Sequence, residues 1–181
     1  TPANPAAHPE AVRAIEDADL VVIGPGSLFT SIVPNLLISG ITAALADSSA
    51  FKIYVCNVAE EPAQTEGYSV LDHLRIVQHY GGPEVIDAVL ANSNLPDGPT
   101  PAGLNFILIN NPWENNVSLV KDDVIDDTDQ ASTARHDPVK LSNAIAGAYS
   151  KYRGRRRRLP RVRLNLRLKH HDSKHIDINT A

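Results

Sequence analysis

Apolar positions follow two different periods along the chain, and the two periods alternate. Continuous apolar or β-branched runs occupy residues 20–23, 52–58 and 85–91. Runs of this length are typical of strands that are covered on both faces of a parallel sheet. Between these runs, apolar residues recur at helical spacing. The predicted helices span residues 9–16, 28–48, 69–80 and 139–149.

The order of these elements predicts an α/β fold. A strand, a helix and a further strand form a right-handed βαβ unit, which gives a mostly parallel sheet with helices on both faces. Pro34 and Gly40 interrupt the second helical region, so we expect a short helix followed by a longer one. Weaker apolar patterns at residues 104–109 and 118–125 predict two further short strands.

Charged residues divide the chain into two parts. Residues 1–150 contain 6 Lys and Arg against 19 Asp and Glu, a balance of −13. Residues 151–181 contain 11 against 2, a balance of +9, and the two parts sum to the net charge of −4. We therefore predict a domain at residues 1–150 and a basic tail at residues 151–181.

The basic tail is open to several interpretations. It contains four consecutive arginines at 155–158, and apolar and polar residues alternate at 162–169. Such a segment could bind nucleic acid or an acidic membrane surface. No aromatic residue is interleaved with the basic ones beyond Tyr152, so nucleic acid is not an expected partner. A solvated tail, or a stretch foreign to the rest of the chain, fits better.

Composition excludes several classes of protein. The single cysteine, Cys56, rules out an internal disulfide framework, and its place in an apolar strand predicts a core residue rather than a nucleophile. No apolar run approaches the roughly 20 residues that span a bilayer. A cytoplasmic protein without a membrane partner is therefore expected. The absence of methionine and the start at Thr1 indicate a piece of a longer chain.

The first candidate site is the loop Gly24-Pro25-Gly26-Ser27, directly after the first predicted strand. Ligands of open α/β sheets bind outside the carboxyl ends of the strands, where glycine lets backbone N–H groups approach an anion. Ser27 is placed to cap the following helix, whose first N–H groups favour a phosphate. The alternative is a tight turn that only joins the strand to the helix.

The second candidate site is the loop that follows the second predicted strand. It contains Gly67 together with Asn57, Thr65 and Tyr68, whose side chains offer neutral donors and acceptors for a sugar or a base. Asn57 is expected beside the glycine loop if the two strands are neighbours. The alternative is ordinary helix capping by Thr65 or Ser69.

The remaining titratable residues predict no metal site. His73 and His79 are six residues apart in one predicted helix, so they cannot share a metal on one face. An acidic run lacks the glycine and the terminal glutamate of a calcium loop, and it predicts a solvated surface instead. This run consists of Asp122, Asp123, Asp126, Asp127 and Asp129.

Three segments resemble one known family. They are ADLVVIGPGSLFTSIVPNLL at 18–37, IYVCN at 53–57 and TEGYSVLDH at 65–73, and HDPVKL at 136–141 is similar to the family's C-terminal pattern. They resemble the YvcK/CofD family of gluconeogenesis factors and 2-phospho-L-lactate transferases, over residues 5–150. The resemblance implies a Rossmann-like fold with a nucleotide-binding site. The implied site residues are Gly24, Gly26, Ser27, Asn57, Thr65, Gly67 and Tyr68.

The resemblance leaves three hypotheses about function. The form of the motifs favours the gluconeogenesis-factor branch, which implies a regulator of carbon metabolism, cell-wall synthesis and cell shape. Its ligand would be a nucleotide sugar of the UDP-N-acetylglucosamine type. The other branch transfers a phospholactyl group from a guanosine-diphosphate donor to a deazaflavin and uses Mg²⁺. The third hypothesis is a nucleic-acid binder with a basic tail.

The sequence assigns no catalytic residue and no further cofactor. A homo-oligomer is compatible with the sequence.

The chain departs from the family pattern at two places. The family begins with a Gly-Gly-Gly-Thr-Gly loop on its first strand, which this sequence does not contain. We therefore expect a sheet without that strand and glycine loop, with one unprotected edge, marginal stability, self-association and weak nucleotide binding. In addition, Gln64 precedes Thr65 where the family commonly has an acidic residue.

Overall fold

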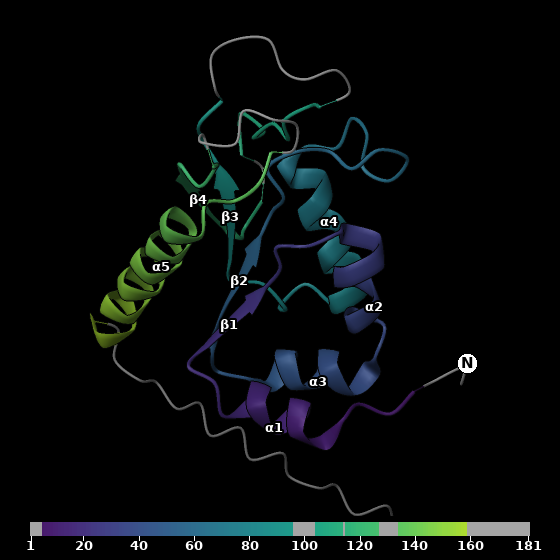
Figure 1. The fold of residues 1–181 in the computed structure, drawn as a ribbon. Coiled ribbons are helices and arrows are strands. Elements are labelled where there is room, and N and C mark those ends of the chain that lie inside the picture. Colours follow the sequence, from purple (N-terminus) through teal and green to yellow (C-terminus); the bar gives the residue numbers. More distant parts are fainter. Residues whose placement is uncertain (1–4, 96–103, 114, 127–133, 159–181) are drawn as a thin grey trace, which may run out of the picture.

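The computed structural model describes residues 5–95, 104–113, 115–126 and 134–158. Four parallel strands form one sheet in the order β1-β2-β3-β4 (Figure 1). Their bounds are Leu20–Ile23 for β1, Phe51–Val55 for β2, Ala88–Asn92 for β3 and Ser118–Asp122 for β4. The chain has a Rossmann-like α/β fold, as the sequence predicted.

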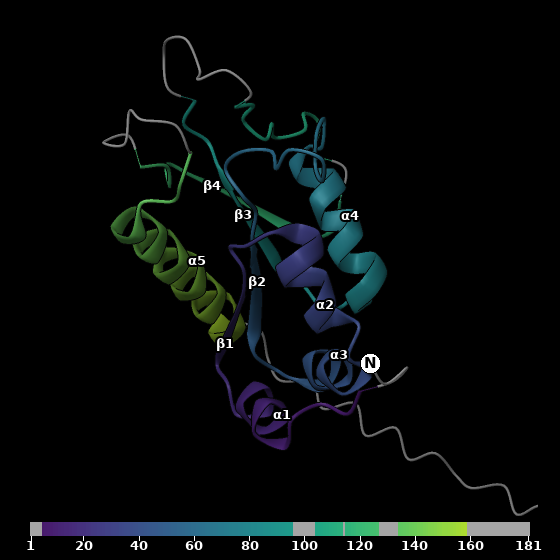
Figure 2. The ribbon, with the colours of Figure 1, turned by 45° about the vertical axis from the view of Figure 1, so that its right-hand side comes forward.

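Helices cover both faces of this sheet. They are α1 (Pro9–Glu16), the π-helical turn η1 (Leu28–Ile32), α2 (Val33–Leu36), α3 (Ser39–Asp47), α4 (Val70–Gly81) and α5 (Pro138–Arg158). α2 and α4 lie on one face and α5 lies on the other (Figures 1 and 2). α1 and α3 pack against each other at the end of the sheet where the strands begin.

β2 lies between two hydrophobic cores, and all of its residues are therefore buried. Alternate side chains of a strand point to opposite faces of the sheet. Phe51, Ile53 and Val55 pack in the core beneath α5. Tyr54 packs in the other core, with residues of α2 and α4. β1 and β3 pair with β2 on its two sides, which leaves both faces of β2 to the helices.

The helical region after β1 is divided as predicted, but at a different position. It is helical at Leu28–Leu36, bends by 75°, and is helical again at Ser39–Asp47. Pro34 lies in the first turn of α2, where its missing N–H removes no intrahelical hydrogen bond. The break therefore lies after Leu36 rather than at the proline.

None of the described helices is by itself long and apolar enough to cross a membrane. The two bent segments on either side of the 75° break reach the required length and composition only when they are taken together.

The predicted strand at residues 104–109 is wrong. Phe106 forms only an isolated antiparallel bridge with Ala59, and the N–H of Ile107 donates to the carbonyl of Val58 at 3.0 Å. The segment thus lies beside the loop after β2, outside the four-stranded sheet. Its apolar pattern has a different cause, since Ile107 is buried in the core shared with α2 and α4.

One helix boundary agrees with the pattern of the sequence and another does not. α4 begins where its sequence predicts, because Ser69 and Asp72 form a reciprocal capping box. α5 continues to Arg158, past the change in charge at residue 150. The rest of the basic tail, including the alternating segment at 162–169, lies outside the described residues.

Phe51 joins α5 to the sheet, and its removal should therefore destabilise the fold. Its ring stacks on Tyr152 with the centroids 4.5 Å apart. We predict that Phe51→Ala lowers the free energy of unfolding by about 3–5 kcal/mol, because it creates a cavity between the strand and the helix. Val139→Ala on the exposed side of α5 is the control, with an expected change within about 0.5 kcal/mol. Urea denaturation followed by circular dichroism measures both, and equal midpoints for the two variants would contradict the described packing.

Candidate functional site

The carboxyl ends of β1 and β2 bring the two candidate loops together. The strands pair in parallel, with Ile23 opposite Tyr54, so the loops that follow them leave the sheet at the same edge. The N–H of Gly26 donates to Asn57 Oδ1 at 3.3 Å. Alongside, the hydroxyl of Ser27 donates to Gln64 Oε1 at 3.1 Å. Two direct hydrogen bonds therefore connect the glycine loop to the loop after β2.

The two glycines of the first loop have different structural roles. Gly24 has a φ of +86°, and a Cβ at this position would lie 2.9 Å from the carbonyl oxygen of Val55. Glycine is therefore required there by the backbone. Gly26 has no positive φ, and its Cβ would meet Ser31 Cβ at 3.4 Å, an ordinary contact. The backbone does not require glycine at position 26. The missing side chain of Gly26 can therefore serve the close approach of a ligand, whereas that of Gly24 is needed for the fold itself.

Ser27 occupies the cap position of η1, but the prediction that its side chain caps the helix is wrong. It makes no cap hydrogen bond because its hydroxyl is directed to Gln64. The first turn of this helical segment therefore has no side-chain acceptor for its N–H groups. Free N–H groups at a helix start, with the positive end of the helix dipole, favour an anion.

The second loop is held by its own polar side chains. Asn57 Nδ2 donates to Glu61 Oε1 at 3.3 Å, and the N–H of Glu61 donates to Thr65 Oγ1 at 2.9 Å. Thr65 is only 1% exposed, so it shapes the loop from inside. Glu61 Oε2 is buried and has no hydrogen-bond partner among the described residues. This carboxylate oxygen is an available acceptor behind Asn57.

Gly67 and Tyr68 line a separate cavity of about 480 Å³, with Phe106 and Leu108 on its apolar walls. Gly67 has a φ of +74°, and its N–H donates to Glu60 Oε1 at 2.9 Å. The structure thus groups Gly24, Gly26, Ser27 and Asn57 at one place, buries Thr65 beside them, and puts Gly67 and Tyr68 on the neighbouring cavity. An edge-to-face contact between Tyr68 and Phe29, at 6.3 Å between the ring centroids, connects the two places.

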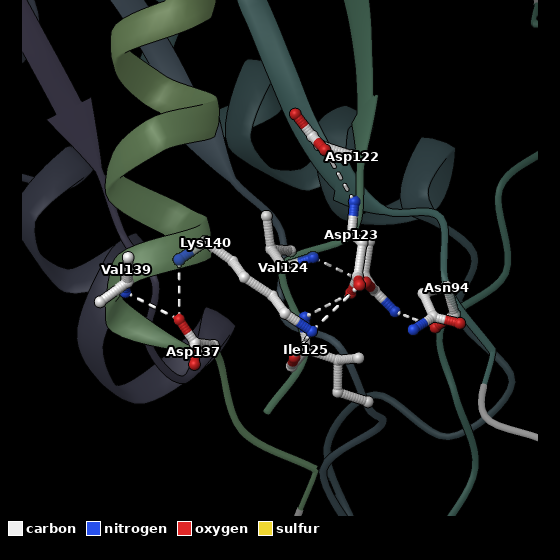
Figure 3. Close-up of polar contacts among 9 residues, drawn as sticks. Asn94, Asp122, Asp123, Val124, Ile125, Asp137, Val139 and Lys140 are labelled. Carbon is white, nitrogen blue, oxygen red and sulfur yellow. Dashed lines mark hydrogen bonds and ion pairs between the residues drawn. The ribbon is translucent and has the colours of Figure 1, made fainter. Parts of the chain in front are cut away.

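The start of α5 also lies near this edge, at residues that the sequence did not predict to belong to a site. His136 Nε2 lies 3.2 Å from the carbonyl oxygen of Cys56, directly before Asn57. Asp137 caps α5 by accepting hydrogen bonds from the N–H groups of Val139 at 2.8 Å and Lys140 at 2.7 Å (Figure 3). The signal in the sequence that points to this region is the HDPVKL motif at 136–141.

Lys140 also corrects the interpretation of the acidic run. Its ammonium group pairs with Asp123 Oδ2 at 3.0 Å and donates to the carbonyl of Ile125 at 3.0 Å (Figure 3). Asp123 is therefore a partner of α5 and not a freely solvated charge. Asp127 and Asp129 lie outside the described residues. Within the described ranges, no three His, Cys, Asp or Glu side chains are close enough to hold a metal ion.

Burial decides the protonation of two groups behind the site. Burial raises the pKa of the Cys56 thiol to about 12, so this cysteine is a core residue as predicted and not a nucleophile. Burial also lowers the pKa of His73, whose Nδ1 lies 3.0 Å from the carbonyl oxygen of Ser69. His73 is therefore neutral at pH 7, with Nδ1 as the donor in this bond.

A parallel α/β sheet with a glycine loop at its carboxyl edge defines the class of Rossmann-like binding proteins. Residues 1–105 match the family described as 2-phospho-L-lactate transferase CofD. The chain belongs to this family, as the sequence resemblance indicated.

Individual relatives agree with this assignment. A relative from Thermotoga maritima is 37% identical over 147 residues, which cover 77% of this chain and 46% of that protein. The gluconeogenesis factor of Bacillus subtilis is 43% identical over 90 residues, which cover 49% of this chain and 28% of that protein. A crystal structure from Bacillus halodurans has a TM-score of 0.73 and 31% identity, over 81% of this chain and 49% of that one. The chain thus spans at most about half the length of these relatives.

The buried neutral state of His73 predicts a stability that depends on pH. Its folded pKa is below the unfolded value near 6.5, so the unfolded chain binds more protons as the pH falls. The contribution of His73 to stability should be fully present above about pH 7 and should decrease as the pH falls from about 7 to 5.5. His73→Asn, which cannot titrate, should reduce this slope whatever its own stability. The exposed His79→Asn on the same helix is the control and should keep the slope of the original chain. Chemical denaturation at each pH measures the slopes, and an unchanged slope in His73→Asn would refute the assignment.

Proposed function

We propose that the carboxyl edge of β1 and β2 forms part of a binding site for a nucleotide sugar of the UDP-N-acetylglucosamine type. The observation that carries the proposal is the direct contact of the two loops, through the bond from the Gly26 N–H to Asn57 Oδ1. By this proposal the protein is a ligand-controlled regulator of carbon metabolism and cell-wall synthesis.

The chemistry of the two loops supports this ligand. A diphosphate suits the uncapped first turn of η1, because backbone N–H groups there have no side-chain acceptor. A sugar suits the neutral side chains of Ser27 and Asn57, which are half-buried at the same edge. The unpartnered Oε2 of Glu61, whose Oε1 accepts from Asn57, supplies an acceptor for a hydroxyl group of the sugar.

The names of the relatives support the regulatory interpretation. The Bacillus subtilis relative is a gluconeogenesis factor, and it is 43% identical in the matched segment. The second candidate function is phospholactyl transfer, which the description of the matched family favours. That reaction implies a guanosine-diphosphate donor and Mg²⁺. The described residues do not form a set of ligands that fits Mg²⁺.

The proposal predicts a preference among nucleotides and a dependence on Asn57. The chain should bind UDP-N-acetylglucosamine in titration calorimetry more tightly than it binds GDP with Mg²⁺. Asn57→Ala should weaken binding of the nucleotide sugar at least tenfold or so, since it removes the group that joins the loops. Asn35→Ala makes the same chemical change on α2, where the exposed side chain donates to the carbonyl of Ser31 at 2.7 Å, and should leave the affinity unchanged.

Two results would overturn parts of this proposal separately. Tighter binding of GDP with Mg²⁺, together with transfer to a deazaflavin, would replace the regulatory function by the transferase function. Equal affinities of the original chain and Asn57→Ala for the nucleotide sugar would place the site elsewhere.

A further inference from the structure

A second cavity, of about 900 Å³, lies at the opposite edge of the sheet, where β2, β3 and β4 begin. We call it the amino-edge pocket. Its walls include Lys52 at the start of β2, Gln78 of α4, Asp87 before β3, and Trp113 and Asn115 before β4. None of these residues belongs to the site proposed above. Lys52 and Asn57 are five positions apart along a strand direction, which separates them by roughly 16 Å.

Lys52 is a buried cation without a counter-ion among the described residues. It is only 6% exposed, and its ammonium group donates to the carbonyl of Ser48 at 3.2 Å. An ammonium group has three N–H donors, and this one forms no ion pair in the described part of the chain. Buried charges in proteins are paired as a rule, because removing a charge from water is costly.

A purely structural role accounts for only one of these three donors. Ser48 is the C-cap of α3, and a lysine near a helix C-terminus compensates the negative end of the dipole. The other two N–H groups remain available on the wall of a pocket large enough for a small molecule. A buried cation on the wall of such a pocket favours an anionic group of a ligand.

The groups around Lys52 restrict the kind of anion. Asp87 Oδ2 accepts a hydrogen bond from the backbone N–H of Lys52 at 2.8 Å, and its Oδ1 has no partner among the described residues. Glu84 also lines the pocket. Two carboxylates and one ammonium group on the walls of one pocket disfavour a doubly charged phosphate. They favour a singly charged ligand that also carries hydrogen-bond donors.

We propose that the amino-edge pocket binds a small hydroxy- or amino-carboxylate. The carboxylate of the ligand pairs with the ammonium group of Lys52, and its hydroxyl or amino group donates to Asp87 Oδ1. The amide group of Gln78, whose Oε1 already accepts from Asn115 Nδ2 at 3.3 Å, has its N–H₂ group left to donate. The Trp113 indole N–H is bound to the carbonyl of Val117 at 2.9 Å, so the ring contributes an apolar wall.

Trp113 makes the proposal testable without any measurement of nucleotide binding. It is the one tryptophan of the chain, and its fluorescence therefore reports on this pocket. L-serine and D-glycerate are expected to change the emission saturably. L-serinamide and glycerol lack the carboxylate and are expected to cause no change. Acetate, which has a carboxylate without a donor group, should bind more weakly than L-serine and D-glycerate.

Variants test the two contacts with the ligand. Lys52→Met keeps an unbranched side chain of similar length but removes the charge, and it should weaken binding of L-serine by roughly tenfold or more. Lys121→Met, at an exposed position of β4, is the matched control and should bind like the original chain. Both variants should keep the affinity for UDP-N-acetylglucosamine, whereas Asn57→Ala should keep the response to L-serine. These comparisons distinguish a failure of the proposal for the amino-edge pocket from a failure of the proposal for the nucleotide-sugar site.

The following outcomes would overturn the proposal. They are an equal response to L-serine and L-serinamide, an absence of saturation, or full binding by Lys52→Met. Acetate as strong as L-serine would refute the role of Asp87. If Lys52→Met does not melt cooperatively, the comparison of L-serine with L-serinamide on the original chain decides the question.

Discussion

Two-sided burial of β2 is the constraint on which the rest of the structure depends. Its alternate side chains fill two separate cores, one beneath α5 and one with α2 and α4. A shift of the strand by one residue would exchange the two sets of side chains and place Lys52 beneath α5. The fixed position of β2 therefore also fixes Asn57 at its carboxyl end and Lys52 at its start. Both proposed sites depend on the position of this five-residue strand.

Features encoded by neighbouring residues were predictable from the sequence. The apolar runs gave the strands, and the capping residues Ser69 and Asp72 gave the start of α4. The contact of Gly26 with Asn57 was also within reach, because parallel neighbours always end at one edge of the sheet. Features that depend on distant partners were not predictable. Residues 104–109 have the composition of a strand, yet their pairing partner is a loop.

The polar groups of the site also depend on residues that are distant in the sequence. Asp123 stands in an acidic run that looks solvated, and only the folded chain brings Lys140 to it across 17 positions. Glu61 Oε2 and His73 Nε2 are buried without partners in the described ranges. Buried polar groups are nearly always bonded, so both atoms mark places where stability alone does not explain the sequence. Both lie in the loop after β2 or in the helix that follows it.

Gly24 has a consequence for how the chain tolerates change. Every other amino acid carries a Cβ, and at this position that atom would lie 2.9 Å from the Val55 carbonyl oxygen in a left-handed backbone conformation. No replacement is conservative here, and the harm does not depend on polarity or charge. At Gly26 the first atom of a side chain has room, so the harm should increase gradually with side-chain size. Two glycines that look equivalent in the sequence therefore respond differently to substitution. At Gly24 every side chain is harmful, whereas at Gly26 the harm depends on the size of the side chain.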